Sequence, residues 1–286
     1  KIPFSKENFL NHFNSNVKTT TSNIDFFDCF EEYITLGKLS KTYNTTKNQK
    51  TIKNFLETFQ NETGFKVTFD NIDGNFYDEL AKYSFFTREI KNNYFSKIIA
   101  ILKAFLNWCN EKGYNKNRYY EKFKNKNHDI DIIYLTFDEL MKLYNHDFGS
   151  NRLNHVKDFY CFGCFSGLRF SDLSQLKSAN INESHIKISI QKTKTQNHII
   201  KLNNYLKEIL DKYRGTIYEP LPNISLTNFN KYLKECCELI KINDQITITS
   251  YIGAKKIQKT VPKHKLITSH TARKTFITNS LLLGME

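Results

Sequence analysis

The chain has 286 residues and carries 42 Lys and Arg residues against 29 Asp and Glu residues, a formal net charge of +13. This length allows two modest domains, each with its own core, and positive charge spread along the whole chain predicts a polyanionic partner, nucleic acid before any other. No apolar run approaches the roughly 20 residues that cross a bilayer, so we expect no membrane role.

The six cysteines predict neither a disulfide framework nor a metal site. Cys161 and Cys164 form a C-x-x-C in an apolar stretch, and the sequence holds no second pair at metal-ligand spacing. We therefore expect buried free thiols, no bound metal and a reducing, cytoplasmic environment.

Residues 23–126 have the pattern of one helical domain. Apolar side chains recur at three- and four-residue spacing, which predicts an all-helical bundle, and Gly64 is expected to end its second helix. The expected helices lie around residues 26–34, 52–59, 76–83 and 95–108. Residues 1–22 precede this pattern and are interpreted as a linker or the end of another region.

Two of these helices begin in stretches that mix hydroxyl, amide and ammonium groups, which suit the positioning of phosphates. The candidate nucleic-acid contacts there are Thr45, Thr46, Lys47, Lys50, Lys91, Tyr94 and Lys97. A solvated capping region explains any single one of these residues equally well.

A domain boundary is expected where residues 121–133 change from polar to apolar, so that a second domain spans residues 127–286. Thr136 and Glu139 then have the spacing of a capping box at the start of a helix.

A turn that contains Arg169 is expected between two buried helices. Gly167 should end the first of them, around residues 155–166, and Ser171 should cap the second. Because an arginine is costly to desolvate, Arg169 either pairs with a carboxylate such as Asp172 or faces an anionic ligand.

Alternating side chains in residues 185–192, answered by residues 199–202, predict a β-hairpin. Lys192 shares the phase of the isoleucines, so it is expected to point toward the protein side, whereas Lys194 lies at the turn. An ordinary hairpin lysine in water fits the pattern of Lys192 nearly as well.

The last expected helix begins at Thr268 or Ser269 and carries His270 and Arg273 on one face, close to its N-terminus. The helix dipole and free N–H groups there would add to the attraction for phosphate. By itself an H-x-x-R pattern is common and usually marks a surface.

Taken in order, Arg169 in a G-L-R-x-S-D-L turn, a hairpin lysine and His270-x-x-Arg273 resemble the catalytic domain of the tyrosine site-specific recombinases, which include phage and transposon integrases. The Gln191-Lys192-Thr193 hairpin is similar to the Bacteroidetes-type branch. The resemblance implies a mainly α protein, with a SAM-like helical core-DNA-binding bundle and a mixed α+β catalytic domain that contains a small β-sheet or hairpin. Residues 1–22 would then end an arm-binding domain.

The same resemblance implies that Arg169 and Arg273 clamp the scissile phosphate. Lys192 would protonate the leaving 5′ oxygen, with Lys194 as the other candidate, and also as a DNA contact. His270 would act as acid/base or phosphate ligand, and the chemistry would need no metal or cofactor.

In the family, a second histidine or tryptophan and then the nucleophilic tyrosine follow this helix. Neither occurs between His270 and Glu286, and the chain begins without Met, so we expect a fragment that binds DNA without cleaving it.

The implied partners are double-stranded DNA at attachment or core sites, three further copies of the chain on synapsed DNA, and possible DNA-bending or excision factors, all at a bacterial nucleoid. Two alternatives stay open. One is a recombinase-like protein that only occupies or regulates DNA sites, and the other is a type IB topoisomerase.

Overall fold

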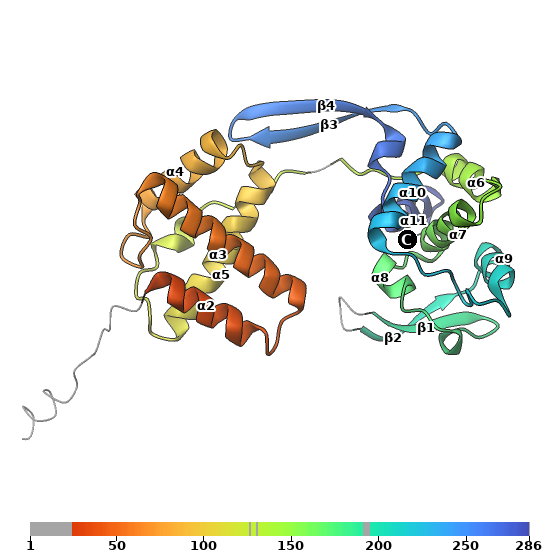
Figure 1. The fold of residues 1–286 in the computed structure, drawn as a ribbon, viewed down its shortest axis with the longest axis horizontal. Coiled ribbons are helices and arrows are strands. Elements are labelled where there is room, and N and C mark those ends of the chain that lie inside the picture. The colour runs from red at the N-terminus through yellow and green to blue at the C-terminus, as the bar shows by residue number, and fades with distance from the viewer. Residues whose placement is uncertain (1–24, 126, 130, 191–194, 286) are drawn as a thin grey trace, which may run out of the picture. The chain divides into compact units, whose positions relative to one another are not determined.

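The computed structural model describes residues 25–125, 127–129, 131–190 and 195–285. The chain divides into two compact units (Figure 1). The first unit comprises Lys1–Asp129 with Ser250–Ile257, and the second comprises Ile130–Thr249 with Gln258–Glu286. Among the helices described, none has the length and apolar character that a membrane span requires.

The first unit is a helical bundle, as the apolar spacing predicts. Its helical elements are α2 (Phe26–Gly37), α3 (Tyr43–Thr63), α4 (Gly74–Lys82), the short π-helix η1 (Tyr83–Thr87), α5 (Asn92–Glu111) and the 3-10 helix η2 (Tyr119–Lys122). Asp25 caps α2 and Thr42 caps α3 through their side-chain oxygens, and Gly64 ends α3 in the left-handed conformation. The expected helices are confirmed.

Aromatic side chains hold this bundle together. The rings of Phe30 in α2 and Phe105 in α5 stack with their centroids 4.1 Å apart, and Phe26 meets Phe105 edge-on at 5.2 Å. Ile52 and Leu56 of α3 are buried in the same core. This rigid packing fixes how α3 and α5 present their outer faces to solvent.

The second unit is mixed α+β, as expected. Its helices are α6 (Phe137–Asn145), α7 (Asn151–Ser166), α8 (Phe170–Leu173), α9 (Asn204–Tyr213), α10 (Leu226–Leu239) and α11 (Ser269–Leu282), with 3-10 turns η3 (Ser178–Asn180) and η4 (Lys263–Leu266). Helix α7 lies at the centre, against α6, α9, α10 and α11, and is buried on all sides from Val156 onward. Its thiols, Cys161 and Cys164, are buried in this core, as expected.

Helix α6 begins with the predicted capping box. Glu139 N donates to the Thr136 hydroxyl at 3.3 Å, and Thr136 N donates to Glu139 Oε2 at 2.7 Å. The same carboxylate forms an ion pair with the buried Lys263 of η4, at 2.5 Å. The carboxylate that caps α6 therefore also connects the start of the second unit to η4, more than 120 residues later in the chain.

The predicted hairpin is present as β1 (His185–Ile190) and β2 (Thr195–Lys201). The strands are antiparallel, with His185 opposite Lys201, and a register shift between Ile188 and Ile190. Ile186 and Ile188 are buried against the core, as the alternation predicts. Residues 191–194, which include Lys192 and Lys194, lie outside the described part of the chain.

A second hairpin, of β3 (Gln245–Ile252) and β4 (Lys255–Pro262), was not predicted. Its tip is part of the first unit. There the Asn92 side chain accepts from Gly253 N at 2.7 Å and donates to Gly253 O at 2.9 Å, and the rings of His128 and Tyr251 stack 5.1 Å apart. Asn92 thus pairs with the hairpin backbone as a neighbouring strand would.

Candidate active site and nucleic-acid interface

The turn that bears Arg169 depends on Gly167. This glycine ends α7 with φ +69°, and its N–H closes the helix on Gly163 O at 2.9 Å. A Cβ at Gly167 would lie only 2.6 Å from Cδ1 of Phe276 in α11. Both the backbone conformation and the contact therefore require glycine.

Arg169 itself is the N-cap residue of α8, and its carbonyl accepts from Asp172 N and Leu173 N, each at 3.0 Å. The prediction that Ser171 caps this helix is wrong, because the chain is already helical at Phe170. Arg169 is half-buried and Asp172 is buried, so the side chain of Arg169 starts at the edge of the core.

Helix α11 places Arg273 beside this turn. Arg273 Nη1 donates to Gly167 O at 2.7 Å. The helix starts at the predicted cap Thr268, whose backbone N–H and carbonyl both bond the Thr271 hydroxyl. That hydroxyl also lies 2.9 Å from Tyr160 Oη of α7, so hydrogen bonds fix α11 against α7 at the level of the arginine.

The electrostatics show that the two arginines are neighbours. Partial burial lowers the pKa of Arg273, and the positive charge of Arg169 lowers this pKa further, whereas the Asp172 carboxylate raises it. Two guanidiniums and one carboxylate leave this end of α7 positively charged. Such an arrangement can bind an anion with several N–H donors, as a phosphodiester requires.

The structure places the other predicted site residues as follows. His270 is exposed on α11, three positions before Arg273, which keeps both on the same side of the helix. Lys192 and Lys194 are outside the described residues. The structure therefore brings Arg169 and Arg273 together, with His270 one turn from Arg273.

Gly163 is a positioning residue that the sequence analysis did not single out. A Cβ there would lie 3.2 Å from Cβ of Ala272 and 3.3 Å from Cδ1 of Leu173. This glycine lets α7, α8 and α11 approach closely enough for Arg273 to reach Gly167. A glycine in the middle of an apolar helix was the available signal, because it costs about 1 kcal/mol there relative to alanine.

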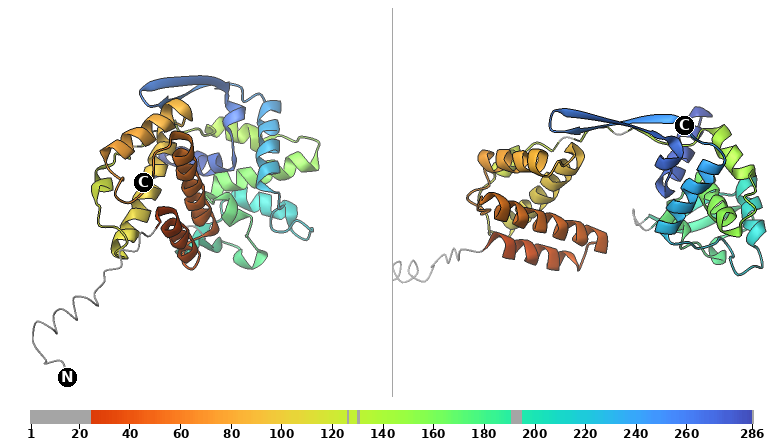
Figure 2. Two further views of the ribbon diagram at one scale, coloured as in Figure 1. Left: turned by 60° about the vertical axis from the view of Figure 1, so that its left-hand side comes forward. Right: turned by 45° about the horizontal axis from the view of Figure 1, so that its top comes forward.

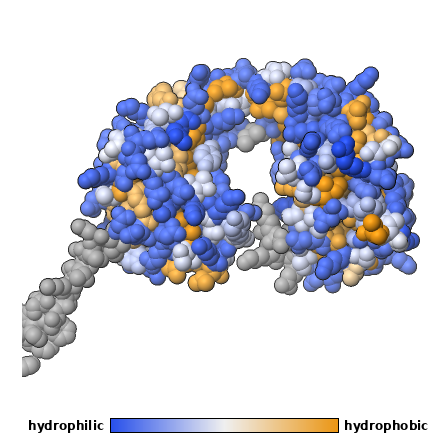
Figure 3. Space-filling model, in the orientation of Figure 1, coloured by the Kyte–Doolittle hydropathy of each residue, from blue (hydrophilic) through white to orange (hydrophobic). Residues whose placement is uncertain are grey.

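On the first unit, Thr45, Lys47 and Lys50 are exposed on α3, and Lys91, Tyr94 and Lys97 are exposed at the start of α5. Lys97 Nζ donates to Asn48 Oδ1 at 2.8 Å, which joins the outer faces of α3 and α5. The surface of the first unit seen in Figure 3 is mainly hydrophilic. These residues are accessible to a ligand.

Thr46 is the exception among the candidate contacts. Its side chain is buried, and its hydroxyl donates to Tyr43 O at 3.0 Å. It faces α2 instead of solvent, so the structure does not offer Thr46 for direct contact with a ligand.

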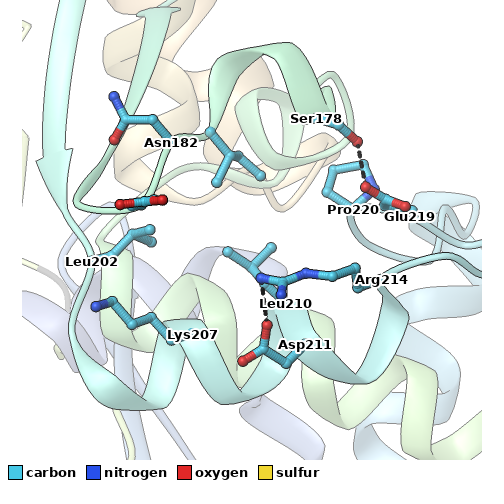
Figure 4. Close-up of a pocket in the computed structure, with 11 residues that line it drawn as sticks. Ser178, Asn182, Leu202, Lys207, Leu210, Asp211, Arg214, Glu219 and Pro220 are labelled. Carbon is cyan, nitrogen blue, oxygen red and sulfur yellow. Dashed lines mark hydrogen bonds and ion pairs between the residues drawn. The ribbon is translucent and has the colours of Figure 1, made fainter.

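A hollow of about 460 Å³ lies elsewhere in the second unit, over α9 and the loop that follows it (Figure 4). Three of its charged side chains, Asp211, Arg214 and Glu219, already have partners within the protein. Asp211 pairs with Arg214 at 2.7 Å, and Glu219 accepts from Ser178 at 3.1 Å and from Gly215 N at 2.8 Å. We assign no role to this hollow.

Residues 25–126 match the family described as phage integrase SAM-like domain. The fold of the chain is similar to a lambda integrase tetramer bound to a Holliday junction, with 15% identity, 94% of this chain and 76% of that chain covered, and a TM-score of 0.67. It is also similar to the Tn1549 transposon integrase (residues 82–397) in complex with circular intermediate DNA, with 13% identity, coverages of 91% and 88%, and a TM-score of 0.62. No curated protein sequence matches the chain.

The chain thus has the fold of the DNA integrases, with a pair of arginines at one end of its central helix. By sequence, residues 25–126 belong to the phage integrase SAM-like domain family, and the likeness of the whole chain to the lambda and Tn1549 integrases is one of fold.

Proposed function

We propose that the protein recombines DNA at specific sites, to integrate or excise a mobile element, by transesterification through a 3′-phosphotyrosyl intermediate. Residues 23–126 would bind the core site, and residues 127–286 would hold the scissile phosphate between Arg169 and Arg273. One observation carries the proposal. The Arg273 guanidinium is hydrogen-bonded to the turn that bears Arg169, close enough for the charge of Arg169 to lower the pKa of Arg273.

The chemistry follows from the charge that develops during phosphoryl transfer. When a tyrosine oxygen attacks the phosphorus and the bond to the 5′ oxygen breaks, negative charge grows on the nonbridging oxygens, where two guanidiniums stabilise it. His270 would contact the same phosphate or move a proton, and Lys192 or Lys194 would protonate the leaving oxygen. We assign no nucleophile among the residues of this chain.

The partner in this proposal is duplex DNA, at attachment or core sites at the bacterial nucleoid. Four copies would assemble on two synapsed sites, a proposal supported by the likeness to the lambda integrase tetramer on a Holliday junction. Accessory DNA-bending or excision factors would be further partners.

The test begins with duplexes that the protein selects from a random-sequence library. Strand exchange is then measured between two copies of a selected site, with the full-length protein, which includes the nucleophilic tyrosine, and its Arg169→Ala variant compared. Exchange by the wild type that Arg169→Ala abolishes supports the proposal. Binding without cleavage would favour a protein that only occupies sites, and relaxation of supercoiled DNA without exchange would favour a topoisomerase.

A further inference from the structure

A lysine-rich hollow lies between the C-terminal end of α2 and the first turns of α3. Its volume is about 460 Å³, and four lysines line it, Lys38, Lys41, Lys47 and Lys50, together with Tyr43 and Glu31. Helices α2 and α3 lie side by side in both views of Figure 2. We call these four side chains the lysine hollow.

We propose that the lysine hollow seats a backbone phosphate of duplex DNA. The inference rests on the proposed function and adds Lys38 and Lys41, from the end of α2 and the following turn, to the contacts expected on α3. The anchor would be independent of base sequence, because lysine ammonium groups act as point charges toward phosphate.

The charge of the hollow is not neutralised from within. Glu31 is the one carboxylate among its lining residues, and Glu31 Oε2 already lies 3.1 Å from Lys53 Nζ. Lys53 also pairs with Glu57 at 3.1 Å, so this ion-pair network belongs to the α2–α3 interface. The four lysines therefore keep a local excess of positive charge that attracts a polyanion.

Lys41 is held in place before any ligand arrives. Its Nζ lies 4.0 Å from the centroid of the buried Tyr33 ring. Its Cδ would lie 3.4 Å from a Cβ at Gly37, so the glycine leaves room for the aliphatic stem to cross the end of α2. A cation–π contact of this kind reduces the side-chain freedom that phosphate binding would otherwise remove.

The start of α3 adds to this attraction. The helix has 21 residues, Thr42 caps it, and no acidic residue lies in its first turn. The partial positive charge of the helix N-terminus is therefore left available beside the lysines. Tyr43, which is 77% exposed, lies at the same end of α3.

The experiment uses the full chain with the double substitution Lys38→Ala/Lys41→Ala. Dissociation constants are measured from about 50 to 200 mM salt for a selected duplex and for an unrelated duplex of the same length. Each lost phosphate contact reduces the slope of log K against log salt by about 0.9, so we expect a reduction of about 1 to 2, with equal weakening for both duplexes. The preference for the selected duplex should stay unchanged.

The matched control is Lys66→Ala/Lys82→Ala, which removes the same charge from exposed positions elsewhere on the first unit. An unchanged slope in the Lys38/Lys41 variant overturns the inference, as does an equal effect of the control or a loss confined to the selected duplex. Lys41→Arg, which keeps the charge, should retain the wild-type slope. If the wild type binds neither duplex, the proposed function itself fails, which is a separate result.

Discussion

The guanidinium of Arg273 donates a hydrogen bond of 2.7 Å to the carbonyl oxygen of Gly167, 106 positions earlier in the chain. That carbonyl lies at the C-terminal end of α7, where helix carbonyls lack partners within the helix and carry partial negative charge. The bond therefore both satisfies the carbonyl and orients the arginine. One end of the guanidinium is fixed to the protein, which leaves its other N–H groups to face a ligand.

Substitution of Gly167 should destabilise the second unit. Gly167→Ala forces an alanine into a φ of +69° and places its Cβ 2.6 Å from Phe276, for a combined cost of about 2–4 kcal/mol. Gly215→Ala is the matched control, because Gly215 has φ +71° and no atom within 4 Å of an added Cβ. Its cost should be about 1 kcal/mol, from the backbone alone. Urea unfolding followed by circular dichroism compares the two, and equal costs would contradict the Phe276 contact.

The hydrogen-bonding geometry of the Arg273 guanidinium can be tested separately from its positive charge. Arg273→Lys keeps the positive charge, but an ammonium cannot bond Gly167 O and fork toward a phosphate in the same way. In the full-length protein, which includes the nucleophilic tyrosine, we expect Arg273→Lys to lower the rate of strand exchange by about 100-fold or more and to change core-site affinity little. Arg88→Lys, at an exposed ion pair in the first unit, should leave the rate near the wild-type value. Full activity of Arg273→Lys would show that charge alone is sufficient.

Lys97 of α5 is hydrogen-bonded to Asn48 of α3. We expect the ammonium group of Lys97 also to contact a DNA phosphate. Lys97→Ala should weaken binding to every duplex and reduce the salt slope by about 1. Lys82→Ala, which removes an exposed lysine from the end of α4, serves as the comparison. A salt slope that is the same in all three proteins would remove Lys97 from the interface.

His155 should make the second unit sensitive to acid. Burial lowers the pKa of His155, whose ring packs 4.4 Å from that of Tyr218. Once the pH falls below about 6.5, the ordinary pKa of histidine, the unfolded chain therefore binds more protons than the folded protein. The free energy of unfolding then decreases as the pH decreases. The fall ends once folded His155 is itself protonated.

This effect is measured as the free energy of unfolding between about pH 7 and 5. His155→Phe should reduce the dependence on pH in this range, whereas His198→Gln, at an exposed position of β2, should leave it unchanged. The same dependence in wild type and His155→Phe would assign the acid sensitivity to other groups.

Local patterns in the sequence were sufficient to predict most elements that frame the site. The apolar spacing of α2 to α5, the alternation of β1, the Thr136–Glu139 capping box and the helix end at Gly167 each depend on neighbours within a few residues. The G-L-R turn and the H-x-x-R helix could be recognised for the same reason, because each motif is contiguous. Ser171 was misplaced as a cap because hydrogen bonds to the Arg169 carbonyl start α8 earlier.

The arrangement of these elements was decided by tertiary packing alone. Thr46 has the composition of an exposed cap residue, yet the packing of α2 against α3 buries it. Strands β3 and β4 are half-exposed or exposed along their whole length, and the hairpin was not predicted although residues 245–249 alternate polar and apolar side chains. The sequence by itself determined the local motifs of the site, which supply its arginines and the glycine that ends α7. Only the approach of α11 to α7, which Gly163 permits, could bring the Arg273 guanidinium to Gly167, because no short-range pattern encodes a contact across 106 positions.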